Sequence, residues 1–211
     1  GLGNALSVII NACSQPGEAV IIFSPVYHSF ARIIKANDRR VHASPMRIKD
    51  GRFKMDLDAL VASLTGDEKI MFLCSPHNPG GRVWSAEELR NVALFCETHD
   101  IILVSDEVHH DLIMPGHSHT ILAKVAPEIS RRLITLVATS KTFNIAGIET
   151  GSMLIPDPAL RQRVARVRHA MNISNNRFGM LMAEAAYRGG DEWLDKLCLL
   201  YTSPSPRDVH L

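Results

Sequence analysis

The stretch LITLVATSKTFNIAGIETG, residues 133–151, decides the fold of this chain. Its apolar and β-branched start, residues 133–137, predicts a buried strand. Three small residues end that strand, and Lys141 follows at once. A lysine at the mouth of a buried strand lies near apolar walls that disfavour its charge, so it can act as an amine nucleophile. For an isolated Ser-Lys pair, a lysine that reaches into solvent is the alternative.

Two other strands end with polar side chains in the same manner. Residues 101–108, IILVSDEV, run from apolar residues into Asp106, and residues 69–81, KIMFLCSPHNPGG, place Asn78 in the turn after a strand. Because the loops at the carboxyl ends of parallel strands form the ligand crevice, we expect an amine, a carboxylate and an amide to meet in one cleft. Taken singly, Asp106 is compatible with a helix cap or an ion pair, and Asn78 with an ordinary Asn-Pro turn.

These polar residues belong to longer motifs. The motifs are Asn78-Pro79-Gly80-Gly81, Asp106-Glu107-Val108-His109 and Ser140-Lys141-Thr142-Phe143-Asn144. In type, order and spacing they resemble the fold-type I enzymes that use pyridoxal 5′-phosphate (PLP). The words SPHNPGGRVWSAEEL, SDEVHHDLIMPGHSHT and ATSKTFNIAG are similar to the MalY/PatB-type cystathionine β-lyases, or cysteine-S-conjugate β-lyases, of the class I/II aminotransferase family.

The resemblance covers residues 1–197 and implies both a fold and roles for single residues. The fold is α/β, the aspartate aminotransferase-like large domain of PLP-dependent transferases, with a mostly parallel sheet flanked by helices. Lys141 would bind PLP as a Schiff base and, once released by the substrate, act as the general base. Asp106 would pair with the pyridine nitrogen, and Asn78 and His109 would hold the ring oxygen. Tyr27 would stack on the ring, although a core tyrosine at a helix start explains it about equally well without the resemblance.

The start of the chain is the expected phosphate site. Gly1, Leu2 and Gly3 form a turn before a helix expected over residues 6–12, and such a turn exposes N–H groups at a positive helix end. A flexible terminus is the alternative, but the resemblance places the phosphate cup here, together with the hydroxyl of Thr139 or Ser140.

One position departs from the aminotransferase pattern. Class I aminotransferases usually carry a phosphate-binding arginine eight residues after the lysine, and this chain has Glu149 there. A carboxylate cannot bind a phosphate dianion by charge, which counts against an ordinary aminotransferase.

Composition limits the partners and the compartment. The chain has 211 residues, 46% of them hydrophobic, and a net charge of +1. That balance gives no case for nucleic acid or an anionic membrane as partner. No apolar run approaches the ~20 residues that span a bilayer. Four cysteines without CxxC spacing are typical of reduced thiols in a cytoplasmic protein, and the resemblance implies a homodimer.

A histidine cluster offers a metal site as an alternative. His109, His110, His117 and His119 follow Asp106 within one loop, with Asp111 among them. Imidazole and carboxylate are good ligands for zinc or iron, but neither an HExxH motif nor a cysteine pair accompanies them. We therefore predict no metal site.

The last residues do not resemble the rest. Residues 198–208, CLLYTSPSPRD, match the translation of a sequencing adapter, although a natural disordered tail is the alternative. We expect residues 1–197 to be a PLP-binding large domain that lacks an N-terminal segment and a C-terminal small domain, and residues 198–211 to be a non-native tail outside the fold.

The resulting functional prediction is a PLP-dependent carbon–sulfur β-lyase. It would cleave cystathionine or another small sulfur-containing amino acid, a cysteine S-conjugate, to a thiol, pyruvate and ammonia. A class I/II aminotransferase on the same scaffold is the first alternative. A non-catalytic protein, either a regulatory binder or an inert fragment, is the second, because a truncated chain need not be active.

Overall fold

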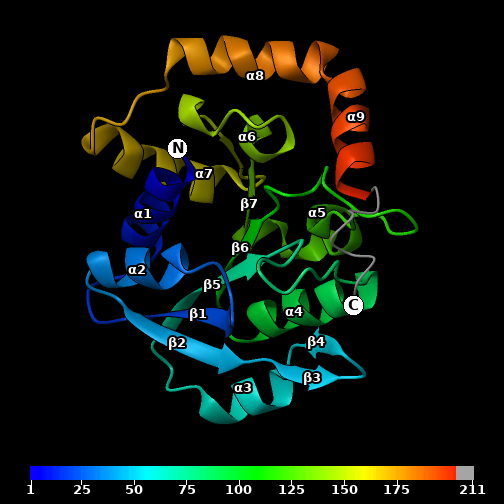
Figure 1. The fold of residues 1–211 in the computed structure, drawn as a ribbon. Helices are drawn as coiled ribbons and strands as arrows, with labels where there is room; N and C mark the ends of the chain where they lie inside the picture. The colour runs from blue at the N-terminus through cyan, green and yellow to red at the C-terminus, as the bar shows by residue number, and fades with distance from the viewer. Residues whose placement is uncertain (203–211) are drawn as a thin grey trace.

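Six strands form one mixed sheet in the order β2-β1-β5-β6-β7-β8 in the computed structural model, which describes residues 1–202 (Figure 1). Every neighbouring pair is parallel except β7 and β8. This confirms the expected mostly parallel sheet flanked by helices. The strands of the sheet are β1 Ala19–Ser24, β2 Arg40–Pro45, β5 Glu68–Cys74, β6 Ile102–Asp106, β7 Leu133–Val137 and β8 Ser152–Leu154.

Helices connect these strands and cover them. None of the described helices is both long and apolar enough to cross a membrane. The α-helices are α1 Leu2–Cys13, α2 Ser29–Ala36, α3 Leu57–Ser63, α4 Ala86–Thr98, α5 Leu122–Val125, α6 Thr139–Thr142, α7 Pro158–Ala170, α8 Arg177–Gly189 and α9 Asp191–Thr202. Two 3₁₀ helices, Pro127–Arg132 and Ala146–Ile148, and a hairpin of β3 Arg47–Lys49 and β4 Arg52–Lys54 complete the described chain.

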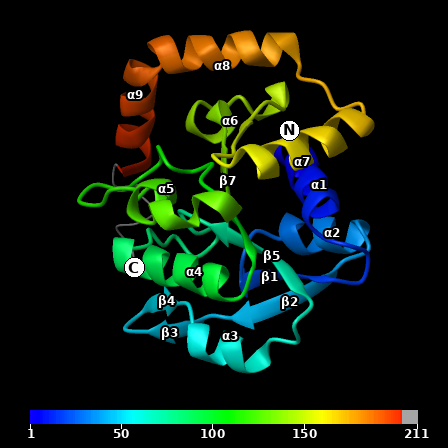
Figure 2. The same cartoon turned by 180° about the vertical axis from the view of Figure 1, so that it is seen from behind.

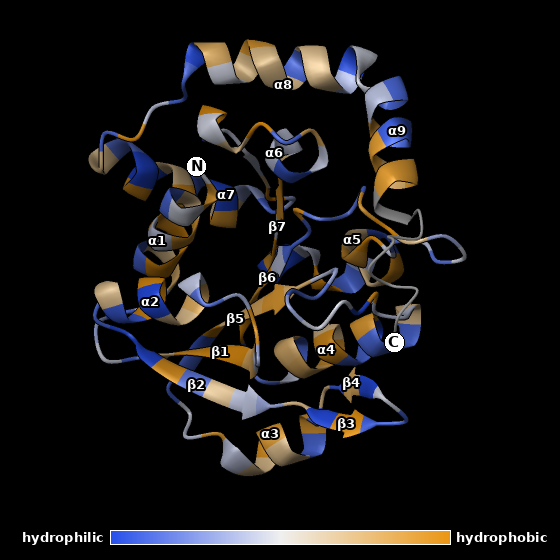
Figure 3. Ribbon diagram, in the orientation of Figure 1, coloured by the Kyte–Doolittle hydropathy of each residue, from blue (hydrophilic) through white to orange (hydrophobic). Residues whose placement is uncertain are grey.

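Side chains alternate between two hydrophobic cores, one on each face of the sheet. In β1, Val20 and Ile22 pack with helices α1, α2 and α7, whereas Ile21 and Phe23 pack with α3, α4 and α5. Because both faces are covered, the central strands are almost continuously apolar, as their colour in Figure 3 shows. The sheet is therefore the rigid middle layer from which the loops project.

The order of the strands reverses next to β1. From β1 the chain crosses to β2 on one side, and it later returns to place β5 on the other side of β1. In open α/β sheets, ligands bind beyond the carboxyl ends of the strands at such a reversal. The register aligns Cys74, Asp106 and Leu136 across β5, β6 and β7, so the three loops that follow begin at one level.

Residues with capping and turn propensity stand at the ends of several elements. Ser85 caps α4 in a capping box: its hydroxyl accepts from the Glu88 N–H at 3.1 Å, and the Glu88 carboxylate accepts from the Ser85 N–H at 2.9 Å. Asp56 caps α3 with its side chain alone, which accepts from the Ala59 N–H at 3.1 Å. Asp50 and Gly51 form the hairpin turn with φ values of 53° and 70°, a conformation that this residue pair tolerates well.

Helix α9 was not expected. Gly190, the C-cap of α8, has a φ of −90° and a ψ of −4°, and α9 follows α8 directly. Helix α9 runs to Thr202, so residues 198–202 continue a helix rather than lying outside the fold as expected. That residues 198–211 are non-native stays a prediction, and residues 203–211 lie outside the described part of the chain.

Candidate active site

The loops after β1, β5, β6 and β7 border a cavity of about 370 Å³. The amine, the carboxylate and the amide that the three strand ends were expected to bring together all line it. Apart from Thr139, every residue for which the sequence predicted a cofactor contact lines the same cavity. These residues are Gly1, Leu2, Gly3, Tyr27, Asn78, Asp106, His109, Ser140 and Lys141.

Asp106 ends β6 at this cavity and is 8% exposed. Burial raises the pKa of its carboxyl group to about 6, and the charge of Glu107 adds to the rise, while a hydrogen bond from the Val108 N–H at 3.3 Å and the charge of Lys141 oppose it. A buried carboxyl with a raised pKa gains most from a cationic partner. The site is therefore suited to a protonated ring nitrogen.

Glu107, the neighbour of Asp106, does not line the cavity. Its carboxylate accepts from the Ser105 hydroxyl at 2.9 Å and lies 2.7 Å from Nε2 of His119. The side chains of Glu107 and His119 are only 3% and 8% exposed. The two adjacent acids therefore differ in role. Asp106 lines the cavity, whereas Glu107 stabilises the loop that follows β6.

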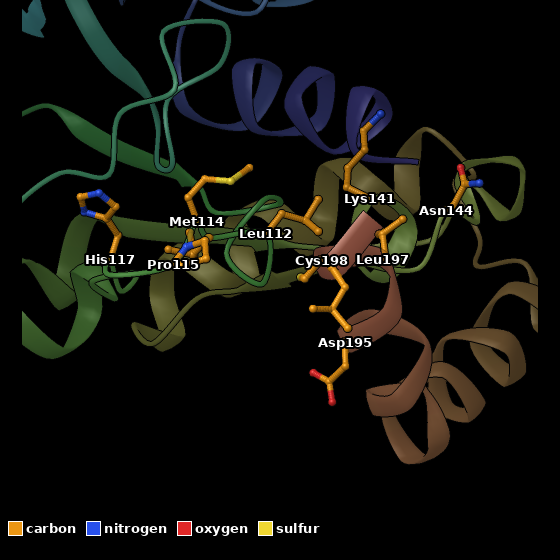
Figure 4. A pocket seen from close by; sticks show the side chains of 11 residues that line it. Leu112, Met114, Pro115, His117, Lys141, Asn144, Asp195, Leu197 and Cys198 are labelled. Atoms are coloured by element: carbon orange, nitrogen blue, oxygen red, sulfur yellow. The ribbon is translucent and has the colours of Figure 1, made fainter. Parts of the chain in front are cut away.

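Lys141 stands in α6, a single helical turn after β7. Its side chain is exposed, so the predicted apolar walls around the amine are wrong for the cofactor-free chain. The reason is that β7 ends at Val137, and Lys141 lies beyond it in the helical turn α6 rather than at the end of the strand. Lys141 also lines a second cavity of about 770 Å³ beside α9, where its amine points away from Asp195 (Figure 4).

The turn that bears Asn78 is held by buried groups below it. The Asn78 N–H donates to Sγ of Cys74 at 3.3 Å, and Nε1 of Trp84 donates to the Cys74 carbonyl at 2.9 Å. His109 faces the same cavity, and burial together with the Lys141 charge lowers the pKa of its imidazole. A neutral His109 and the amide of Asn78 can both donate a hydrogen bond to an oxygen.

Tyr27 lies at the cavity after β1 and is 39% exposed. Its ring meets Phe30 edge to face with a centroid distance of 5.8 Å, and Phe30 in turn meets Phe72 at 5.2 Å. The aromatic contact fixes Tyr27 against the core while much of its ring stays exposed. This suits a side chain that stacks on a flat ligand.

The opposite end of the cavity is formed by the start of α1. No side chain caps this helix, and its first N–H groups have no partner within the helix, which is the arrangement that binds anions. Ser140 lines the cavity, whereas Thr139 is 2% exposed and its hydroxyl finds no partner in residues 1–200. Of the two residues whose hydroxyls were predicted to hold the phosphate, only Ser140 therefore lines the cavity.

Two charged side chains at this end complete the electrostatics. Glu149 lines the cavity, and its Cβ lies 3.5 Å from where a Cβ on Gly1 would be. Arg32 of α2 also lines the cavity, although it belongs to no motif that could have marked it in advance.

The histidine cluster is divided among different surroundings. His109 lines the cavity, His119 pairs with Glu107, and His117 lines the second cavity. Within residues 1–202, no three His, Cys, Asp or Glu side chains come together as a metal site needs.

Together, the doubly wound sheet and the polar cavity at its reversal define an α/β protein with a ligand site at the strand ends. Residues 1–197 match the family described as Aminotransferase class I and II. The chain belongs to that family.

Curated relatives and solved structures agree with this assignment. The chain is 37% identical over 204 residues to cystathionine beta-lyase PatB of Bacillus subtilis, covering 93% of this chain and 51% of the relative. It is 33% identical to protein MalY of Escherichia coli, covering 91% and 49%. Cystalysin from Treponema denticola, a structure that contains pyridoxal 5′-phosphate, superposes with a TM-score of 0.88 at 35% identity, covering 93% and 50%. The chain thus spans about half the length of the relatives it matches.

Proposed function

We propose that this chain forms the cofactor-binding core of a PLP-dependent carbon–sulfur β-lyase. The observation that carries the proposal is the position of Lys141 and Asp106 on one cavity, with a helix N-terminus at its other end. The names of PatB and cystalysin's bound cofactor support it. The proposed substrate is cystathionine or another cysteine S-conjugate.

The residues present fit the cofactor in charge and shape. Lys141 would hold it through its ε-amine, Asp106 through the ring nitrogen, and Tyr27 through its ring face. The N–H groups of Leu2 and Gly3 and the hydroxyl of Ser140 would hold the phosphate. When bound, PLP withdraws electrons from the α-carbon of an amino acid.

The chain's own residues then move protons. Once the substrate amine has displaced it, Nζ of Lys141 can take the proton from the α-carbon as general base. Asp106 would keep the ring nitrogen of the bound cofactor protonated, because a buried carboxylate stabilises a cationic partner. Loss of the β-sulfur as a thiolate, followed by hydrolysis, yields pyruvate and ammonia.

An aminotransferase on the same scaffold is the second candidate. It shares every residue that acts up to removal of the α-proton, and only Glu149 in place of a phosphate-binding arginine argues against it. A non-catalytic regulatory or inert fragment is the candidate from another class, because the chain spans about half of its relatives' length.

Two experiments distinguish these candidates. Adding PLP to the chain should produce the visible absorbance band of a lysine-bound cofactor, and Lys141→Ala should abolish it. If no such band appears, the result supports the non-catalytic regulatory or inert fragment. The whole protein should then release thiol and pyruvate from cystathionine without an added oxo acid, whereas a requirement for 2-oxoglutarate would identify an aminotransferase.

For the whole protein we further infer a cytoplasmic homodimer. The buried, free thiols of Cys74 and Cys96 support a reducing compartment. Sedimentation of the full-length protein would test the dimer.

A further inference from the structure

The helix that bears Lys141 is held in place from outside. Helix α6 spans only Thr139–Thr142, and one helical turn has too few internal hydrogen bonds to fix its own orientation. Thr142 is fully buried, and its hydroxyl donates to Oδ2 of Asp111 at 2.9 Å. This side-chain bond joins the lysine-bearing turn to the loop that follows β6.

Asp111 is itself surrounded by polar groups. Its Oδ1 lies 3.3 Å from Nε2 of His110, whose Nδ1 lies 2.7 Å from the Glu107 carbonyl oxygen. Burial, and after it the charge of Asp111, raises the pKa of the Tyr187 hydroxyl in α8. The contact with His110 helps to orient the Asp111 carboxylate that accepts the hydrogen bond from Thr142.

The base of the same loop is fixed next to Asp106. Glu107 accepts from Ser105 at 2.9 Å and from the N–H of Leu122 at 3.4 Å, and it lies 2.7 Å from Nε2 of His119. Glu107 follows Asp106 in the chain, and Thr142 follows Lys141. One network outside the cavity therefore connects the neighbours of the two groups that face the cofactor.

The orientation of α6 matters because Lys141 borders two cavities. One is the cavity shared with Asp106, and the other is the larger one beside α9 (Figure 4). Both views of the fold show α8 beyond α6 on the side away from the sheet, and α9 running down one side of the molecule from the end of α8 (Figure 1 and Figure 2). If the single-turn helix α6 rotated about its axis, the Lys141 amine would move from one cavity toward the other.

We propose that Asp111 is a positioning residue that, through Thr142, holds the Lys141 amine toward the cavity that contains Asp106. Neither Asp111 nor Thr142 lines that cavity, so neither can contact the cofactor directly. The inference rests on the proposed function, since it concerns the bond between Lys141 and PLP.

The test compares PLP binding by the whole chain and four variants. Asp111→Ala and Thr142→Val should each weaken the affinity for PLP, followed by the visible band, by about tenfold, the effect of one charge-assisted hydrogen bond. The double variant should be no weaker than either single one, because both remove the same bond. Thr142→Ser keeps the hydroxyl and should bind PLP as the unsubstituted chain does.

The matched control is Asp56→Ala, which removes a helix-capping carboxylate that accepts from the Ala59 N–H at 3.1 Å and does not line the cavity. It should lower the denaturant midpoint and leave PLP affinity unchanged. Equal affinity in all variants, independent effects in the double variant, or an equal loss in Asp56→Ala would overturn the inference alone. A band missing from the unsubstituted chain would overturn the proposed function together with the inference.

Discussion

Nε2 of His77 lies 2.7 Å from the carbonyl oxygen of Pro25. His77 is 3% exposed, and its ring meets Trp84 edge to face at a centroid distance of 5.5 Å. Burial lowers the pKa of His77, so the neutral ring donates this hydrogen bond. The bond crosses the reversal between β1 and β5 and ties the loop that bears Tyr27 to the turn that bears Asn78.

Replacing His77 should therefore loosen two cofactor contacts at once. We expect His77→Phe to cost about 1 kcal/mol of unfolding free energy, because it removes the hydrogen bond that the buried His77 ring donates to the Pro25 carbonyl. His77→Phe should also weaken PLP binding. His77→Gln can still donate a hydrogen bond, so it should lose less unfolding free energy and less PLP affinity. Urea unfolding and PLP titration measure the two effects. A stable His77→Phe variant with unchanged PLP affinity would show that the two loops are positioned independently.

Without the cofactor, the ionised Asp106 carboxylate should lower the free energy of unfolding of the chain. Its pKa is about 6 in the folded chain, above the ordinary value of 3.8. Its contribution to stability is therefore fully present below pH ~4 and is lost as the pH rises through 6, a difference of about 3 kcal/mol. Asp106→Asn should accordingly stabilise the cofactor-free chain at pH 8 and lose PLP affinity.

Urea unfolding at two pH values checks this prediction. Below pH ~4 both side chains are neutral, so the stabilities of Asp106→Asn and the unsubstituted chain should converge there. If Asp106→Asn were less stable than the unsubstituted chain at pH 8, burial of the ionised Asp106 carboxylate would not be destabilising, and the prediction would be wrong.

Glu68 should govern part of the acid stability. Burial raises its pKa, but hydrogen bonds from His42 and from the hydroxyl and N–H of Thr65 outweigh burial and bring the pKa to about 2. Its contribution is present above pH ~4.5 and is lost as the pH falls through 2, so Glu68→Gln should cost about 3 kcal/mol at pH 7.

The adjacent residue provides the control for Glu68. Asp67 pairs with Arg40 at 2.9 Å, but the two side chains are 61% and 52% exposed. Asp67→Asn should change stability by no more than about 1 kcal/mol, because exposed ion pairs contribute little. Thermal unfolding between pH 2 and 7 would show the pH-dependent difference for Glu68→Gln alone; equal curves would refute it.

The phosphate end of the cavity should respond to charge in opposite directions at two residues. Glu149→Gln should strengthen PLP binding, and Arg32→Gln should weaken it, each by about threefold because both side chains are exposed to solvent. Pyridoxal, which lacks the phosphate, is the control ligand and should bind both variants like the unsubstituted chain. A similar change with pyridoxal would mean that these residues act on the ring or on folding.

The sequence by itself determined three strands, their order along the chain and the residues at their carboxyl ends. Apolar runs bounded by turns mark β5, β6 and β7, and the polar residue after each run, Asn78, Asp106 or Lys141, is readable without a structure. The capping box at Ser85 is equally local. These features could be predicted because hydrophobic periodicity and capping depend on residues a few positions apart.

Only the tertiary structure decided which side chains from distant segments meet. It brought Arg32 to the phosphate end, separated Ser140 from the buried Thr139, and paired Thr142 with Asp111. It also exposed the lysine that the sequence had placed among apolar walls. Such contacts follow from strand register, helix packing and loop closure, which depend on the whole folded chain, so no short window of sequence contains them.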